Sequence, residues 1–222
     1  MNLLVVSDLH GDKRILDLVP STILKKIDEI IVCGDLTHYG DLHQVHSMID
    51  DLTRRGRSVL FVPGNCDPKK LATLPSVKSA INLHGTCEHR GTFDFMGVGG
   101  STPGPFNTPL ELSEEKIAQL LNKARSKTTS RFPVIVVSHS PPVNTQVDLT
   151  SFGMHVGSRA LRQFIEVEKP LLVLCGHIHE ARGIDMIDTV KIVNPGPAHL
   201  GFYALVDIDE GSGVVQVNLE SL

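Results

Sequence analysis

The chain has 222 residues, of which 41% are hydrophobic, and a formal net charge of −4 at pH 7. That length can bury one large core, and we expect residues 1–222 to form a single domain. The acidic balance excludes a surface built for stable nucleic-acid binding, which needs clustered lysine and arginine, although it permits a nucleotide in a metal-lined cleft.

Nothing in the sequence predicts a membrane-bound or secreted protein. The N-terminal apolar run is too short for a signal peptide and soon reaches Asp8, and no later segment has the length of a membrane span. Cys33, Cys66, Cys87 and Cys175 show neither CxxC spacing nor a disulfide-framework pattern, so we expect reduced thiols. These features predict a cytoplasmic protein without membrane contacts.

Predicted strands alternate with predicted helices through the first half of the chain. Short apolar runs are typical of buried parallel strands, and apolar residues at helical spacing indicate helices. The first elements expected are a strand at 2–7, a helix at 12–26, a strand at 29–33, a helix at 41–55 and a strand at 58–62. Short β segments follow between 80 and 98, and a glycine- and proline-rich loop spans 97–109.

The second half begins with helices and strands and ends in strands alone. Ser113 precedes an amphipathic run that predicts a capped helix. A strand at 133–138, a helix at 158–168 and a strand at 170–175 follow, and the tail predicts an antiparallel meander of strands at 184–188, 190–193, 202–207 and 214–219. Together these elements predict an α/β (α+β) fold, a four-layer α/β/β/α sandwich of two packed mixed sheets with flanking helices.

Metal-capable side chains follow the carboxyl ends of five predicted strands, at the edge of an α/β sheet where ligands bind. Gly176 follows the last of these strands and permits a tight turn. The two histidines after this glycine are spaced so that both side chains point the same way in extended chain. Any one of these residues could instead cap a helix or form a turn, but the repeated placement favours one metal-lined cleft. The residues are Asp8 and His10, Asp35, Asn65 and Asp67, His139, and His177 and His179.

These blocks resemble the calcineurin-like metallophosphoesterase family, in the same order along nearly the whole chain. The matching motifs are Asp8-Leu9-His10, Gly34-Asp35, Gly64-Asn65-Cys66-Asp67, Ser138-His139-Ser140 and Gly176-His177-Ile178-His179. The loop that begins at Gly97 and the turn at Asn194-Pro195-Gly196 look like a small prokaryotic subgroup of that family. The resemblance implies a hydrolase that acts on phosphate ester bonds.

The resemblance also implies a metal position for each matching ligand. Asp8, His10 and His179 would hold one divalent ion, Asn65, His139 and His177 would hold the other, and Asp35 would bridge both. Manganese is the metal we expect, although iron, nickel and zinc suit the same donors. Two such ions clamp the attacking and leaving oxygens of the phosphoryl group and create a bridging hydroxide that attacks phosphorus.

Cys66 departs from the family pattern, because many members carry histidine at this position. That histidine is thought to steady the phosphate or protonate the leaving group, helped by the acidic residue that follows it, here Asp67. A thiol is a poor hydrogen-bonding replacement, and cysteine here is similar to what some phosphodiesterase-type members carry. We therefore expect Asn65, His139 and Asp67 to be the catalytic residues and Cys66 to contact the substrate.

Two further histidines, His38 and His155, lie in predicted loops within reach of the cleft, and we expect them to contact the phosphate unless they are ordinary loop residues. The other histidines, His84, His89 and His199 among them, have no evident partner and are assigned no role. The main prediction is a two-metal phosphodiesterase acting on a small phosphate ester, with nucleotides among the candidate substrates. A phosphomonoesterase and a metal-retaining interaction protein of the same fold are the alternatives.

Overall fold

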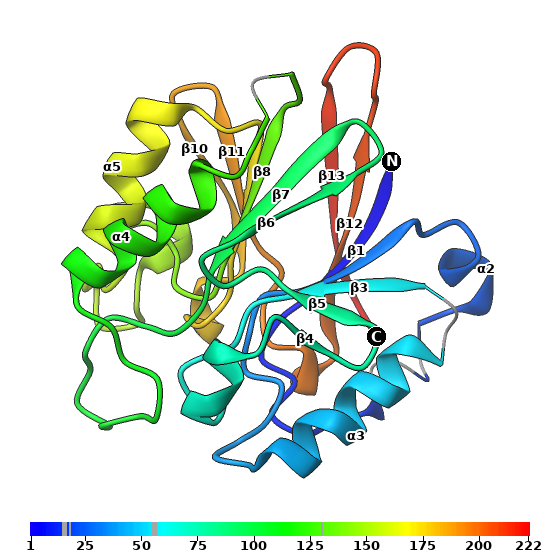
Figure 1. Ribbon diagram of the computed structural model, residues 1–222, viewed down its shortest axis with the longest axis horizontal. Coiled ribbons are helices and arrows are strands. Elements are labelled where there is room, and N and C mark those ends of the chain that lie inside the picture. The colour runs from blue at the N-terminus through cyan, green and yellow to red at the C-terminus, as the bar shows by residue number, and fades with distance from the viewer. Residues whose placement is uncertain (15–16, 18, 55–56, 130) are drawn as a thin grey trace.

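The computed structural model describes residues 1–14, 17, 19–54, 57–129 and 131–222, and it shows two mixed sheets packed face to face (Figure 1). The seven-stranded sheet has the order β13 (Val215–Ser221), β12 (Phe202–Ile208), β1 (Asn2–Val6), β2 (Glu29–Val32), β3 (Ser58–Phe61), β5 (Ala80–Asn82) and β4 (Ser76–Val77). The six-stranded sheet has the order β10 (Gly183–Ile187), β11 (Val190–Asn194), β9 (Leu172–Leu174), β8 (Val134–Ser138), β7 (Phe93–Val98) and β6 (Cys87–Arg90).

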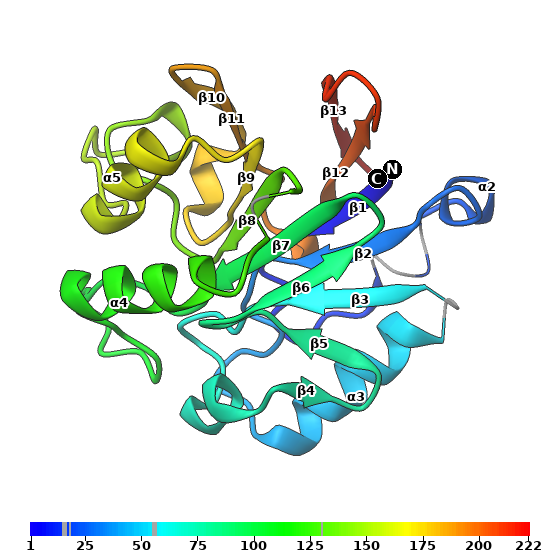
Figure 2. The ribbon, with the colours of Figure 1, turned by 45° about the horizontal axis from the view of Figure 1, so that its top comes forward.

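Helices cover the outer faces of the two sheets (Figure 2). The short α2 (Ser21–Leu24) and the longer α3 (Leu42–Thr53) pack on the seven-stranded sheet, whereas α4 (Glu114–Arg125) and α5 (Arg159–Glu168) pack on the six-stranded sheet. The expected four-layer α/β/β/α sandwich is therefore confirmed. In the described part of the chain, no helix combines the length and apolar composition that crossing a bilayer requires.

Strand β1 shows why the predicted strands are apolar without interruption. Successive side chains of a strand point to opposite faces. Leu3 and Val5 therefore enter the core between the two sheets, and Leu4 and Val6 enter the core beneath α3. A strand that is buried on both faces has no polar alternation, as the sequence pattern indicated.

The helix boundaries follow from local capping chemistry. The side chain of Asp41 accepts the Gln44 N–H at 2.9 Å at the start of α3, and Ser113 and Ser158 cap α4 and α5 in the same way. The helix predicted at 12–26 includes α2, which begins after Pro20, but its residues 15–16 and 18 lie outside the described part of the chain.

The meander predicted for the tail is wrong, because the four tail strands form two hairpins in different sheets. β11 pairs with β10 and, in parallel, with β9, whereas β12 pairs with β13 and, antiparallel, with β1. Between the hairpins the turn at 194–196 and the short helix η4 (Ala198–Leu200) carry the chain across the edge of the sandwich. The Ala198 N–H donates to Ser7 O at 2.8 Å and fixes this crossing beside the end of β1.

Candidate metal centre

The turns that follow β1, β2, β3, β8 and β9 meet at one edge of the sandwich. Strands β1, β2 and β3 are parallel in one sheet and β7, β8 and β9 are parallel in the other, so each sheet gathers its carboxyl ends at one edge. Asp8, His10, Asp35 and His177 all adopt positive φ, with values of 55°, 47°, 50° and 70°. Left-handed backbone is strained for residues other than glycine, and such strain gathers at functional sites.

Glycine permits the closest approach between these turns. A Cβ on Gly176 would lie 1.8 Å from Ser7 Oγ and 2.8 Å from Asp8 Oδ2, so no larger residue fits between the end of β9 and the end of β1. The same close approach lets the His177 N–H donate to Asp8 Oδ2 at 3.1 Å. The Gly176 turn therefore places two histidines next to the first aspartate.

Asp8, His10 and His179 form the first ligand group. Asp8 Oδ1 lies 3.2 Å from His179 Nε2 and 3.9 Å from His10 Nε2, and the two imidazole nitrogens are 3.4 Å apart. Asp8 Oδ1 is buried and has no hydrogen-bond partner among the described residues. A buried, unpartnered carboxylate oxygen facing two imidazoles suits a cation.

Asn65, His139 and His177 form the second ligand group. His139 Nε2 lies 2.7 Å from Asn65 Oδ1, and the rings of His139 and His177 are 4.9 Å apart between centroids. The other ring nitrogen, Nδ1, lies 2.7 Å from Cys33 O, which can only accept a hydrogen bond. A neutral His139 ring therefore donates from Nδ1 and turns the lone pair of Nε2 toward the oxygen of Asn65. Two acceptors this close fit a shared cation, and the Cys33 carbonyl fixes the tautomer that a ligand needs.

Asp35 lies between the two ligand groups. Its Oδ2 is 3.8 Å from His10 Nε2 on one side and 3.6 Å from His139 Nε2 on the other. Its Oδ1 accepts the backbone N–H of Cys66 at 2.8 Å, which holds the carboxylate in this orientation. The ligand atoms of Asp8, Asp35 and His139 all lie within 4.8 Å of one another, as do those of Asp8, His10 and His179. One carboxylate oxygen thus faces both groups.

Burial keeps the imidazoles of His10 and His177 neutral and makes the bridging carboxylate easy to protonate in the metal-free protein. Burial lowers the pKa of His10 to about 4 and that of His177 to about 3. Burial alone would lower the pKa of His179 too, but the neighbouring Asp8 carboxylate raises it above its usual value. Burial, with the nearby Asp8 and Asp67, raises the pKa of Asp35 to about 7. Burial alone would raise the pKa of Asp8 too, but His179 and His139 bring it below its usual range. Neutral imidazoles and crowded carboxylates are the donors that divalent metals select.

Asp67, which we expected to be catalytic, has its carboxylate hydrogen-bonded to backbone N–H groups. It is fully buried and accepts hydrogen bonds from the N–H groups of Gly64, Leu36 and Thr37 and from the Thr37 hydroxyl, at 2.8 to 3.1 Å. These contacts join the turn after β2 to the turn after β3. The geometry makes Asp67 a positioning residue for Asp35 and Asn65.

Cys66 and His38 lie together beside the first ligand group. Ligand atoms of His10, His38 and Cys66 fall within 4.8 Å of one another, and the rings of His10 and His38 are 5.2 Å apart. His38 is exposed and stacks edge-on against Tyr39. Burial, and then the charge of Asp35, raises the pKa of the Cys66 thiol well above its usual value, so the thiol stays protonated. The structure therefore brings together Cys66 and His38, two of the residues expected to contact the substrate.

Among the described residues, His155 contacts Asp148 and none of the predicted ligands, whereas the structure brings His199 into the centre. His155 Nδ1 lies 2.7 Å from the buried Asp148 carboxylate, which is outside the ligand groups. His199 Nδ1 lies 2.9 Å from Asp8 O, and the His199 ring is 5.2 Å from that of His10 and 5.4 Å from that of His179. The only sequence signal for His199 was its position after the turn at 194–196, because the sheet crossing that places it depends on long-range pairing.

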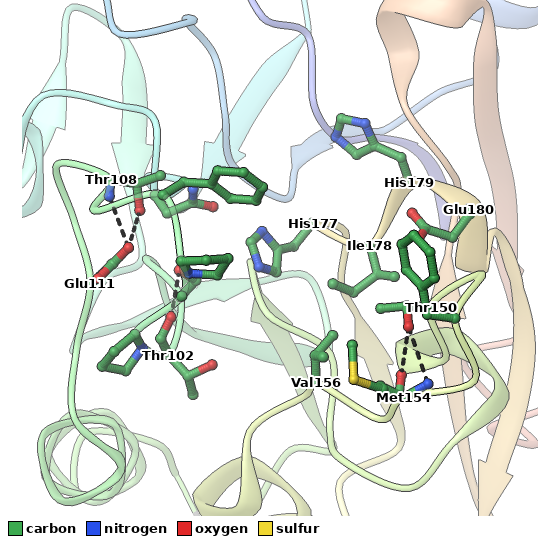
Figure 3. Close-up of a pocket in the computed structure, with 17 residues that line it drawn as sticks. Thr102, Thr108, Glu111, Thr150, Met154, Val156, His177, Ile178, His179 and Glu180 are labelled. Carbon is green, nitrogen blue, oxygen red and sulfur yellow. Dashed lines mark hydrogen bonds between the residues drawn. The ribbon is translucent and has the colours of Figure 1, made fainter.

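A cavity of about 630 Å³ opens beside the two ligand groups. Asn65, His177 and His179 line one end of it, and Figure 3 shows the ring of His177 pointing into it. One wall carries Thr108 and Glu111, and the other carries Met154 and Val156 (Figure 3). A pocket of this size next to convergent polar groups is typical of a substrate site.

The fold and the seven convergent donors define a metal-binding α/β/β/α protein, and comparison with known proteins gives its family. The profile for calcineurin-like phosphoesterases matches residues 1–181, so the chain belongs to that family. An uncharacterized protein of Methanocaldococcus jannaschii is 38% identical over 204 residues, which are 89% of this chain and 88% of that protein.

Two solved structures show the same fold at low sequence identity. TT1561 of Thermus thermophilus has a TM-score of 0.72 and 21% identity, over 98% of this chain and 97% of that one. Phosphopantetheinyl hydrolase from Mycobacterium tuberculosis has a TM-score of 0.58 and 16% identity, over 88% of this chain and 89% of that one. The predicted family resemblance is confirmed, together with its implication of a phosphoesterase that binds divalent metal.

Proposed function

We propose that the protein is a two-metal phosphodiesterase that acts on a small phosphate ester, with nucleotides among its candidate substrates. The observation that carries the proposal is the position of Asp35 Oδ2, which lies 3.8 Å and 3.6 Å from an imidazole of each ligand group. A carboxylate between two such groups suits a pair of ions that share one ligand. With two divalent ions held there, the site would supply positive charge for the phosphate oxygens and a water acidic enough to attack near neutral pH.

The side chains around the centre favour an anionic substrate once the ions are held. Asp8 and Asp35 supply the two carboxylates of the ligand set, and Asn65 supplies a neutral amide oxygen, so the charge of two divalent ions is only partly offset. The amide nitrogen of Asn65 donates to Cys66 Sγ at 3.4 Å, which keeps the amide oxygen on the side of His139. The residual positive charge would then attract and orient a phosphate ester.

Cys66 supports a diester rather than a monoester as the substrate. A monoester dianion carries a second charge, and its leaving group gains from a neighbouring imidazolium that donates a proton. The thiol of Cys66 is neutral and buried, so it offers neither a positive charge nor a ready proton at this position. A diester carries a single charge and therefore depends less on a positive charge or a proton donor at the position of Cys66.

The setting we propose for this activity is the cytoplasm. Cys33, Cys66, Cys87 and Cys175 are all free thiols in the structure. Free cysteines are usual where the cell keeps thiols reduced, and this supports a reducing compartment.

Hydrolysis of bis-p-nitrophenyl phosphate by manganese-reconstituted protein tests the proposed function. We expect metal-dependent turnover that chelation abolishes and that His179→Ala lowers by at least about 100-fold. Removing a direct metal ligand should lower activity more than removing a residue that only orients a ligand. His43→Ala, which changes an exposed histidine on α3, is the matched control and should retain full activity. The proposal fails if no diester is hydrolysed at any metal loading, or if both variants lose activity equally.

A further inference from the structure

Three exposed apolar side chains stand on the walls of the cavity beside the ligand groups. Phe106 is 80% exposed, Phe152 is 86% exposed and Met154 is 57% exposed, and all three line the cavity. Large apolar side chains left in water are unfavourable, and a cluster of them beside a polar site marks a surface that binds something. The cluster comes from two separate loops, at 101–111 and 149–156, which we call the first wall and the second wall.

The first wall is built onto a predicted metal ligand. Ser101 and Leu110 pair across it, with the Ser101 N–H donating to Leu110 O at 3.2 Å, and the Leu110 N–H donates to Asn65 O at 3.0 Å. Glu111 accepts the N–H and hydroxyl of Thr108 at 2.8 and 2.9 Å, which fixes the loop just after Phe106 (Figure 3). Phe106 therefore projects from a loop whose two ends are held by hydrogen bonds.

The second wall is held to the turn that carries His179. The Thr150 N–H donates to Met154 O at 2.9 Å, and the Ser151 N–H donates to the carboxylate of Glu180 at 3.2 Å. At the base of this wall, buried Asp148 accepts the N–H groups of Thr145 and Gly157 at 2.8 and 2.9 Å. Both walls are thus fixed relative to the centre, so a group attached to a phosphate there would lie between them.

The charges on the walls exclude a second phosphate. No lysine or arginine is among the described residues that line the cavity, and its acidic side chains are Glu111 and Glu180. A polyphosphate arm would meet two carboxylates and no cation, whereas an uncharged group would meet phenylalanine, methionine, valine and proline side chains. The volume of about 630 Å³ lies within the range of pockets that enclose drug-sized groups.

We propose, building on the proposed phosphodiesterase function, that the cavity binds an uncharged, bulky apolar group carried by the phosphate of the substrate. The substrate class is then a phosphodiester with one hydrophobic ester group, either a flat ring or a hydrocarbon chain. Phe106 and Phe152 are its specificity-determining residues. They contact the apolar group from opposite walls while the ligand groups hold the phosphate.

Phosphinates test this assignment by binding alone, because they carry the single charge of a diester but have no ester bond to hydrolyse. Calorimetry with manganese-loaded protein should show that methylphenylphosphinate and methyloctylphosphinate bind more tightly than dimethylphosphinate, by about 10- to 100-fold for burial of one side-chain-sized apolar group. The stronger of the two larger probes identifies a ring or a chain, and either result supports the cavity.

Phe106→Ala combined with Phe152→Ala should reduce that preference severalfold and leave dimethylphosphinate binding and the melting temperature unchanged, because both rings are exposed. Val214→Ala truncates an exposed apolar side chain between β12 and β13 and is the control that should retain the preference. Equal affinities for all three phosphinates would overturn the inference, even if diesters are hydrolysed. A retained preference in a protein that hydrolyses no diester would instead refute the proposed function and leave the apolar site standing.

Discussion

Replacing Asp35 with asparagine tests whether one carboxylate serves two metal positions. Asparagine has the shape of aspartate and can still accept the Cys66 N–H through an oxygen, so the surrounding turns should keep their structure. The substitution removes one negative charge whose Oδ2 lies 3.8 Å from His10 Nε2 and 3.6 Å from His139 Nε2. Two unit charges about 4 Å apart interact by about 4 kcal/mol in an effective dielectric of about 20.

That energy predicts a large loss of metal affinity at both positions. Each factor of ten in affinity corresponds to about 1.4 kcal/mol, and the amide oxygen can still act as a neutral ligand, so we expect both manganese dissociation constants to rise by about 100- to 1000-fold. Calorimetric titration of metal-free protein measures the two sites together. His179→Ala is the matched comparison, because it removes a ligand from one group and should weaken one ion much more than the other. Loss of a single ion in both variants would refute the bridging role.

Three further predictions concern substrate choice, pH and folding. Manganese-loaded protein should prefer bis-p-nitrophenyl phosphate to p-nitrophenyl phosphate. Cys66→His should shift the kcat/KM ratio toward the monoester, because proton donation by an imidazole is worth about 10²- to 10⁴-fold. The same variant should add a limb to the pH profile near the imidazole pKa of about 6.5. An unchanged ratio and pH profile would show that Cys66 does not set the substrate class. Manganese affinity, measured by calorimetry, should fall as the pH drops below about 7 and level off above it. The reason is that the pKa of Asp35 is raised to about 7 and the metal needs the ionised carboxylate. An affinity independent of pH would contradict this prediction. Truncation after Asp188 removes β12, the neighbour of β1, and should abolish folding, whereas a soluble fragment with a cooperative melting transition would contradict a single domain.

The sequence predicted the layers and the ligand-bearing turns because both depend on local patterns. A strand buried on two faces is apolar throughout, so β1, β2, β3, β8 and β9 could be located without knowing their partners. The carboxyl ends of parallel strands share one edge of a sheet, which gathers Asp8 with Asp35 in the seven-stranded sheet and His139 with His179 in the six-stranded sheet. The capping side chains of Ser113 and Ser158 likewise act within one turn of helix.

The features that the sequence did not predict depend on contacts between distant segments. The tail strands follow one another with short turns, a pattern that suits an antiparallel meander. No local sequence pattern indicates that β11 pairs with β9 whereas β12 pairs with β1. Missing that crossing also hid His199, which reaches the centre only because η4 packs on the end of β1. The burial of Asp67 against backbone N–H groups depends on two turns that meet in space.

The metal content of the reconstituted protein tests the central claim most directly. Asp8, His10, Asp35, Asn65, His139, His177 and His179 form two groups that share one carboxylate, and this geometry predicts two ions per chain. Elemental analysis after manganese reconstitution and removal of free metal should therefore give two ions per chain, and fewer than one for Asp35→Asn because both positions lose affinity. One ion or none in the unmodified protein would contradict the two-metal centre.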